Sequence, residues 1–255
     1  MKKFIIGVLI SIFFTANLFA QITATKKLGV KQERIANQDI KRSFSTDEIG
    51  KYHNYVLDVF RTNKVDILDN RAVSNLLKKQ LPHLDKRFTA EEIDNVMKIY
   101  SSPPFKKWLE DLIRSGGSPG PYNPNAESPK IITEVQNQVL ESLVKNGETT
   151  NNFSDVIKKI SSLELNNFNR AVSQELNNNN LSKVEKEYLN VYSSIYKASN
   201  EYWSIVRPTS TAIGACWWCV YACDALGGLA GAAGGPGGSI VLGAVFSAAS
   251  DYANQ

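Results

Sequence analysis

The three cysteines of the chain lie close together, at Cys216, Cys219 and Cys223. Thiolates at Cys-x-x-Cys spacing can exchange disulfides or bind zinc. The redox reaction needs a thiolate at a helix start that follows a strand, and the zinc site needs a fourth ligand; the surrounding sequence indicates neither. A disulfide among these cysteines or a set of buried thiols is therefore the favoured interpretation, and the odd number leaves one thiol free or joined to another chain.

Other residues capable of chemistry are few. His53 and His83 are the only histidines, and they fall in different predicted segments, so we expect both to be exposed surface residues. Acidic pairs such as Glu91-Glu92 occupy predicted first helical turns, where they offset the helix dipole. The chain has no nucleophile elbow, phosphate-binding glycine loop or His-Glu-x-x-His helix. We expect no catalytic residue, no metal and no cofactor, and we favour a protein that is not an enzyme.

The same C-terminal region has a regular spacing of small residues. Residues 208–255 contain nine of the sixteen glycines and no Lys, Arg or His. Small residues at every fourth position let two helices approach backbone to backbone. The predicted contact residues are Gly227, Gly231, Gly234, Gly235, Gly238 and Gly243.

This spacing predicts a helical hairpin at the end of the chain. One arm is expected from about residue 210 to 233, a turn over 234–238, and a second arm over 239–252. The second arm would be ~21 Å long, short of the ~30 Å hydrocarbon core of a bilayer. Insertion in a membrane and burial in the core of the protein both remain open for this hairpin.

The N-terminal residues read as a secretory signal peptide. Lys2 and Lys3 precede an apolar run over residues 4–14, and the segment ends at Ala20. The run is shorter than the ~20 residues that a spanning helix needs. We expect cleavage before Gln21 and export to the periplasm or the medium.

The body of the chain is predicted to be helical. A hydroxyl-x-x-carboxylate spacing typical of helix starts occurs at Ser45, Thr89 and Ser182, and Ser-Pro pairs at Ser102 and Ser128 mark two more starts. Apolar residues recur at every third or fourth position, as in Ile132, Val135, Val139 and Leu143, and then in Phe153, Ile157, Ile160, Phe168 and Val172. The predicted fold class is mainly α, one or more exported helical bundles with a C-terminal Gly/Ala-rich helical hairpin.

Composition divides the chain into segments. The Pro- and Gly-rich residues 115–130 predict a linker, and the Asn run over 177–180 predicts a turn between helices. The expected organisation is a signal peptide (1–20), a flexible lead-in (21–44), a helical domain (45–114), the linker (115–130), a second helical domain (131–207) and the hairpin tail (208–255).

The net charge of the chain is small. It is +4 at pH 7, and two of these charges lie in the predicted signal peptide. Nucleic-acid binding needs Lys and Arg clustered on one face, so we expect no nucleic-acid partner.

Residues 87–115 resemble a recurring element of an uncharacterised family of small helical periplasmic domains. The matching residues are Phe88, Thr89, Glu91, Glu92, Ile93, Tyr100, Ser101 and Lys107. The chain has Pro104 and Phe105 where that element has a glycine. The resemblance implies a helical exported domain and no particular activity.

The order of signal peptide, helical body and glycine-rich tail is similar to precursors of bacteriocin-like peptides, including the halocin type. The residues that carry this similarity are Cys216, Cys219, Cys223, Gly227, Gly228, Gly231, Gly234, Gly235, Gly238 and Gly243. The tail departs from the pattern in having fewer cysteines and a negative charge. The resemblance implies damage to a target membrane by the tail, with the body as chaperone or immunity segment.

These observations lead to one hypothesis and one alternative. We expect an exported, non-enzymatic helical protein whose glycine-zipper tail inserts in membranes or self-associates, as in a bacteriocin-like precursor. The alternative is a periplasmic helical binding or scaffold protein in which the tail is a buried core hairpin. The location of the tail distinguishes the two.

Overall fold

The computed structural model describes residues 44–116, 127–206 and 217–252, and all regular structure in these ranges is helical. The mainly α fold class predicted from the sequence is thus confirmed. The predicted signal peptide and residues 21–43 of the lead-in lie outside the described residues. The helices are α2 (Thr46–Asn63), α3 (Asn70–Leu84), α4 (Ala90–Tyr100), α5 (Pro103–Gly116), α6 (Glu127–Lys145), α7 (Asn151–Ser161), α8 (Leu165–Asn177), α9 (Lys183–Val206), α10 (Trp217–Ala232) and α11 (Gly235–Tyr252).

The helix starts follow from hydrogen bonds of side chains to free backbone amides. At α2, the Ser45 hydroxyl accepts from the Glu48 amide while the Glu48 carboxylate accepts from the Ser45 amide, which is a complete capping box. Ser182 and Glu185 make the same reciprocal pair at α9. Thr89 caps α4 through the Glu92 amide. These predicted starts are therefore present, and each satisfies amides that a helix leaves without partners.

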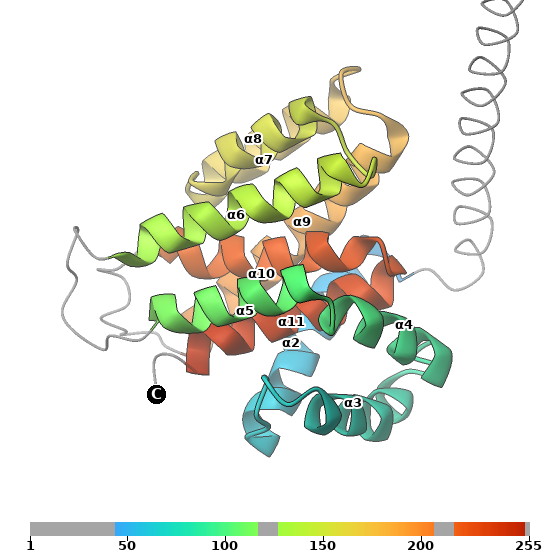
Figure 1. Ribbon diagram of the computed structural model, residues 1–255. Helices are drawn as coiled ribbons and strands as arrows, with labels where there is room; N and C mark the ends of the chain where they lie inside the picture. The colour runs from blue at the N-terminus through green and yellow to red at the C-terminus, as the bar shows by residue number, and fades with distance from the viewer. Residues whose placement is uncertain (1–43, 117–126, 207–216, 253–255) are drawn as a thin grey trace, which may run out of the picture. The chain divides into compact units, whose positions relative to one another are not determined.

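The hairpin of α10 and α11 lies at the centre of the fold (Figure 1). Helices α2, α5 and α4 pack on α11, and α9 and α6 pack on α10. Outside this first layer, α3 packs on α4, while α7 and α8 pack on α6 and α9. The helices that come last in the sequence are thus surrounded by those that come earlier.

The described residues, 44–116, 127–206 and 217–252, belong to one compact unit. Helices from both sides of residues 115–130 pack on the same hairpin, and α5 also contacts α6. The expected division into 45–114 and 131–207 therefore does not correspond to two separate cores. The reason is that both halves bury their apolar stripes against α10 and α11.

Helix α5 extends to Gly116 and α6 begins at Glu127, so both enter the predicted linker, whose residues 117–126 lie outside the described residues.

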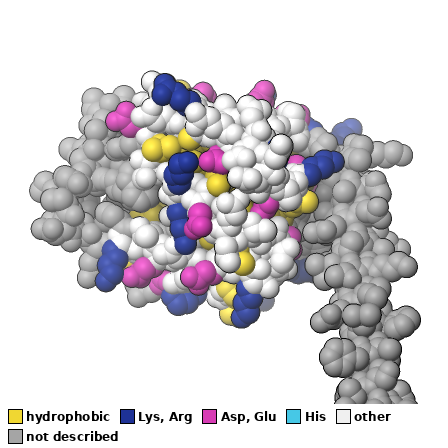
Figure 2. Space-filling model, turned by 90° about the horizontal axis from the view of Figure 1, so that it is seen from above, with side chains coloured by type: hydrophobic (Ala, Val, Ile, Leu, Met, Phe, Trp, Pro, Cys, Tyr) yellow, Lys and Arg dark blue, Asp and Glu magenta, His cyan; other side chains and the backbone are white. Residues whose placement is uncertain are grey.

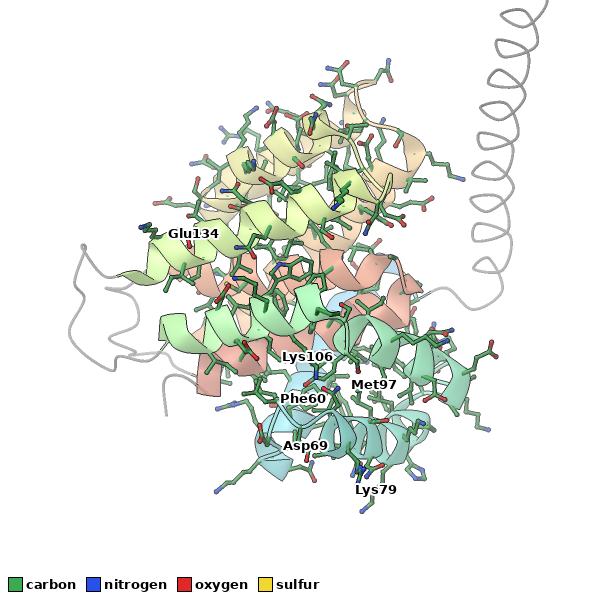
Figure 3. The ribbon with its side chains drawn as sticks, viewed as in Figure 1. Phe60, Asp69, Lys79, Met97, Lys106 and Glu134 are labelled. Carbon is green, nitrogen blue, oxygen red and sulfur yellow. The ribbon has the colours of Figure 1, made fainter. Side chains whose placement is uncertain are left out.

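Side chains divide between core and surface as helical periodicity requires. Phe60 and Met97 are buried and point toward the interior between α2 and α4, whereas Lys79 and Glu134 are exposed and point outward (Figure 3). On the face seen in Figure 2, basic and acidic side chains are interspersed, with small groups of hydrophobic side chains between them. Phe44, assigned by sequence to the flexible lead-in, is 5% exposed, and its ring centroid lies 5.0 Å from that of Phe88, so the packed body begins at least one residue earlier than expected.

Candidate functional site

The contact between α10 and α11 is made through glycine. A Cβ atom at Gly231 would collide with the backbone of Gly238 and would lie 2.8 Å from the Ser239 nitrogen. A Cβ at Gly238 would in turn collide with the carbonyl of Gly231. One turn away, a Cβ at Gly227 would collide with the Leu242 carbonyl and lie 2.8 Å from the Phe246 Cβ. The two helices therefore touch backbone to backbone at Gly231 and Gly238, where neither has a side chain, and the absence of a side chain at Gly227 lets α10 approach the Leu242 carbonyl and the Phe246 side chain.

The other glycines named from the sequence have different surroundings. Gly234 lies in the connection, and Gly235, the first residue of α11, has a φ of 81°, a left-handed conformation that favours glycine. A Cβ at Gly234 would lie 2.9 Å from Ile99 of α4. A Cβ at Gly243 would lie 3.0 Å from the His53 ring, so this residue faces α2 as well as α10.

The turn of the hairpin is shorter than predicted. Residues 233 and 234 form it, and α11 begins at Gly235 rather than at Ser239. Pro236 is compatible with this start, because the first turn of a helix leaves amides unbonded and so does not need the proline N–H. The expected turn over 234–238 is therefore wrong in its extent. Residues 207–216, which include the predicted start of the first arm, lie outside the described residues.

Helices α10 and α11 are buried on nearly every side. Among the described side chains of the hairpin, the fully buried apolar ones are Ala222, Ala225, Leu226, Leu229, Ile240, Leu242, Ala244, Val245, Phe246 and Ala249. They point in all directions around the two helix axes, which is the pattern of a helix buried in a core or in lipid. Within residues 44–116, 127–206 and 217–252, none of the helices combines the length and apolar character needed to cross a bilayer.

A carboxyl group lies in the middle of this apolar hairpin. Asp224 of α10 is completely buried. Its Oδ2 atom accepts hydrogen bonds from the hydroxyls of Ser199 at 2.5 Å and Ser247 at 2.7 Å, and from the Trp203 indole at 3.4 Å. Hydrogen bonds to a buried carboxylate offset part of the large cost of removing it from water. Because the donors come from α9 and α11, the carboxylate connects three helices.

His53 of α2 faces the same carboxylate. The imidazole is completely buried, and its Nε2 atom lies 3.9 Å from Oδ2 of Asp224, beyond hydrogen-bond distance. The Nδ1 atom lies 2.9 Å from the Asn54 side-chain oxygen, and the Asn54 amide nitrogen donates to the Ala198 carbonyl. This orientation of Asn54 puts the ring proton on Nδ1 and leaves Nε2 without a hydrogen-bond partner. Burial lowers the pKa of His53 to about 4, although Asn54 and the Gly243 backbone act in the opposite direction.

The expectation for the histidines is therefore half wrong. His83 is exposed at the end of α3, as predicted, but His53 is 0% exposed. The error has a physical cause: His53 lies on the buried face of α2, in register with Ile49, Val56 and Phe60. The spacing of three to four residues between His53 and these apolar residues indicates that His53 lies on the buried face of the helix.

The cysteines are only partly described. Cys223 is a free, buried thiol on α10, and burial together with Asp224 raises its pKa. Cys216 and the side chain of Cys219 lie outside the described residues, so the pairing expected among Cys216, Cys219 and Cys223 stays a prediction. A thiol with a raised pKa carries little thiolate, which makes Cys223 a poor nucleophile or metal ligand.

The buried cluster of His53, Ser199, Asp224 and Ser247, called here the polar cluster, is not arranged for nucleophilic catalysis. Both serine hydroxyls donate to the carboxylate, whereas a catalytic serine must bond to the histidine that removes its proton. In the part of the chain that the structure describes, no three His, Cys, Asp or Glu side chains gather as a metal site. The geometry instead suits a contact that ties α2, α9, α10 and α11 together.

Sequence reasoning did not find the polar cluster. Ser199, Trp203 and Asp224 are not among the residues that the sequence predicted to be functional. A lone Asp in the middle of an apolar Gly/Ala segment was a usable signal, since a buried carboxylate requires donors from elsewhere in the fold.

Comparisons with models of known protein families, with curated proteins and with solved structures yield no match to this chain.

Proposed function

We propose that this protein carries α10 and α11 as a membrane-active hairpin and keeps it covered in water by the amphipathic helices around it. The observation that supports the proposal is the distribution of apolar residues on the hairpin, which lie on all sides of both helices. The similarity of the tail to bacteriocin-like peptides points in the same direction. On this proposal the protein acts without an enzymatic step, and its partner is a lipid bilayer.

The geometry also bears on how the hairpin would enter lipid. Helices α10 and α11 have 16 and 18 residues, or about 24 and 27 Å at 1.5 Å per residue. These lengths fall short of the ~30 Å hydrocarbon core. We therefore expect insertion into one leaflet or local thinning of the bilayer, with the glycine contacts between the two helices retained.

A second candidate function is a helical scaffold or binding protein in which the hairpin is permanently the core. The polar cluster favours this reading, because Asp224 with its donors from α9 and α11 fixes the hairpin to the surrounding helices. A carboxylate at the centre of a membrane-inserted helix costs roughly 2.5–3.5 kcal/mol on insertion scales. The two functions differ in whether the hairpin separates from the helices that pack around it.

The test uses the intact chain and vesicles of phosphatidylethanolamine and phosphatidylglycerol. Release of a trapped dye is measured, and a lipid with a photoactivatable group in its acyl chain is then cross-linked to the protein and located by mass spectrometry. The proposal predicts dye release and cross-links within Trp217–Tyr252, with the polar surface helix α8 (Leu165–Asn177) as the internal control. No release, or cross-links confined to the outer helices, would support the scaffold reading.

A further inference from the structure

The polar cluster has a feature that a purely structural contact does not require. The Nε2 atom of His53 is a buried ring nitrogen with no hydrogen bond, held 3.9 Å from the Asp224 carboxylate. Removing a polar atom from water without giving it a partner costs free energy. Such an atom in a native core is a candidate for a functional role, and the change open to this one is the uptake of a proton.

We infer that His53 is an acid-sensitive contact between α2 and the α10–α11 hairpin, and that its protonation loosens the cover over the hairpin. The inference concerns the folded protein in water, and it holds whether or not the hairpin acts on membranes. If the proposed function is correct, protonation of His53 is the step that would release the hairpin.

The close packing around the imidazole leaves a cation little room to adjust. The His53 Cδ2 atom would lie 3.0 Å from a Cβ at Gly243, so the ring rests directly on the backbone of α11. On its other side, Asn54 is held by the Ala198 carbonyl of α9. A protonated ring therefore cannot turn toward solvent unless α2 separates from α9 and α11.

The groups that contact His53, and those that interact with its neighbour Asp224, come from each helix packed around the imidazole. The titratable ones are on α10: Asp224, whose carboxylate faces Nε2, and Tyr221 and Cys223, whose pKa values are raised by burial first and by Asp224 second. The remaining groups do not titrate in the acid range; they are Asn54 on α2, Ser199 and Trp203 on α9, and Gly243 and Ser247 on α11. The Asp224 oxygen nearest to Nε2 already accepts three hydrogen bonds, so it is committed to donors other than His53.

The sign of the pH effect follows from the complete burial of His53, because removing the ring from water disfavours its charged form by more than Asn54 and the Gly243 backbone favour it. The pKa is 6.5 for a histidine in water and about 4 for His53 in the folded protein, so the unfolded chain binds the proton more tightly. The contribution of neutral His53 to the stability of the fold is fully present above pH 6.5 and is lost as the pH falls toward 4. Well below pH 4, this effect lowers the ratio of folded to unfolded molecules by about 300-fold. At pH 4 the ratio is lowered on the order of 100-fold.

The experiment compares three forms of the full chain: wild type, His53→Gln and, as a matched control, His83→Gln at the exposed histidine. Urea denaturation is followed by circular dichroism in buffers from pH 7 to pH 4. We expect the folded-to-unfolded ratio of the wild type and of His83→Gln to fall on the order of 100-fold more than that of His53→Gln. Acid-sensitive carboxylates elsewhere act on all three forms, so the difference isolates His53. Parallel profiles would overturn the inference.

A second measurement covers the case in which His53→Gln does not fold. The chain has only two histidines, so the imidazole C–H signals in the NMR spectrum of the wild type can be followed against pH. We expect one of them to titrate below pH 5. A His53 that titrates at or above pH 6.5 would mean that the proton strengthens the contact with Asp224, and the inference would be wrong.

Dye release at pH 7 and pH 4 separates this inference from the proposed function. If the wild type is destabilised through His53 but releases no dye at either pH, the membrane proposal fails and the acid-sensitive contact stands. If dye is released but wild type and His53→Gln respond to pH in parallel, the membrane proposal stands and the role of His53 fails.

Discussion

Replacing Gly231 by alanine tests the backbone contact between α10 and α11. In a helix that touches nothing at this position, glycine to alanine stabilises the fold by about 1 kcal/mol, because alanine loses less backbone entropy on folding. Here the added methyl group would collide with the Gly238 carbonyl and approach the Ser239 nitrogen to 2.8 Å. The two environments predict opposite signs for the same substitution.

The magnitude follows from the kind of atoms that the methyl group meets. Overpacking a core costs about 1–3 kcal/mol, and we take the upper end because the obstructing atoms are backbone, which cannot rotate away. Subtracting the gain in helix propensity leaves a net decrease of about 2 kcal/mol in the free energy of unfolding. For a body of this size that loss lowers Tm by about 4–8 °C.

Thermal and urea denaturation of Gly231→Ala, Gly238→Ala and the double variant measure this effect. Both glycines lie at one contact, so once the first methyl group has separated the helices, the second should cost about 1 kcal/mol less than it does alone. A useful comparison is Gly147→Ala, where no atom lies within 4 Å of the added Cβ and any cost comes from its φ of 73°. If Gly231→Ala is neutral or stabilising, the close approach of α10 and α11 does not exist.

The remaining predictions concern other parts of the chain. Gly231→Leu should destabilise the protein more than Leu242→Ala, which by cavity formation costs about 2–5 kcal/mol; urea denaturation ranks the two. Arg87 donates to Glu48 and Asp85, and its side-chain hydrogen bonds lower the pKa of Glu48 to about 2 and that of Asp85 further. Stability from these carboxylates is present above pH 4.5 and is lost as the pH falls to 2, so Arg87→Met should flatten the acid limb of a urea series, and an unchanged limb would contradict the pairing. In a Cys216→Ser, Cys219→Ser background, Cys223 should resist maleimide in the native protein and react in guanidinium chloride, because it is 1% exposed; rapid native labelling would show an open hairpin. Exported protein should begin at Gln21 on N-terminal sequencing, and material that still begins at Met1 would argue for a retained anchor.

The helices were predictable because their signals are local. The hydroxyl at Ser45 and the carboxylate at Glu48 act within one turn, and the apolar spacing from Ile132 to Leu143 depends only on helix periodicity. Not every such signal was found. Thr150 caps α7, and its amide and hydroxyl both donate to Glu185, so one carboxylate serves the starts of α7 and α9. That bond joins residues 35 positions apart, and no local pattern predicts it.

The arrangement of the helices was less accessible, since it depends on contacts between distant residues. The spacing of Gly227 and Gly231 suggested that α10 has a close partner, but both a bilayer and a protein core place apolar side chains on every face of a helix. The sequence therefore could not say what surrounds the hairpin. The partners of Asp224 come from positions 199, 203 and 247, and the three fall into register only after α9 and α11 have packed.

The central position of α10 and α11 has a consequence for how the chain acquires its structure. The hairpin is synthesised after α2, α4, α5, α6 and α9, yet all five helices pack on it. Until it emerges, α2 can pack only on α9 and α5 only on α4 and α6, and the apolar side chains that face the hairpin stay uncovered. Contacts that close the fold, such as the bond from the Gly50 amide to Ser194, span 144 positions. Folding dominated by such distant contacts is slow. The body should therefore become native only after α10 and α11 have been synthesised, because a chain that stops before α10 lacks the two helices at the centre of the fold.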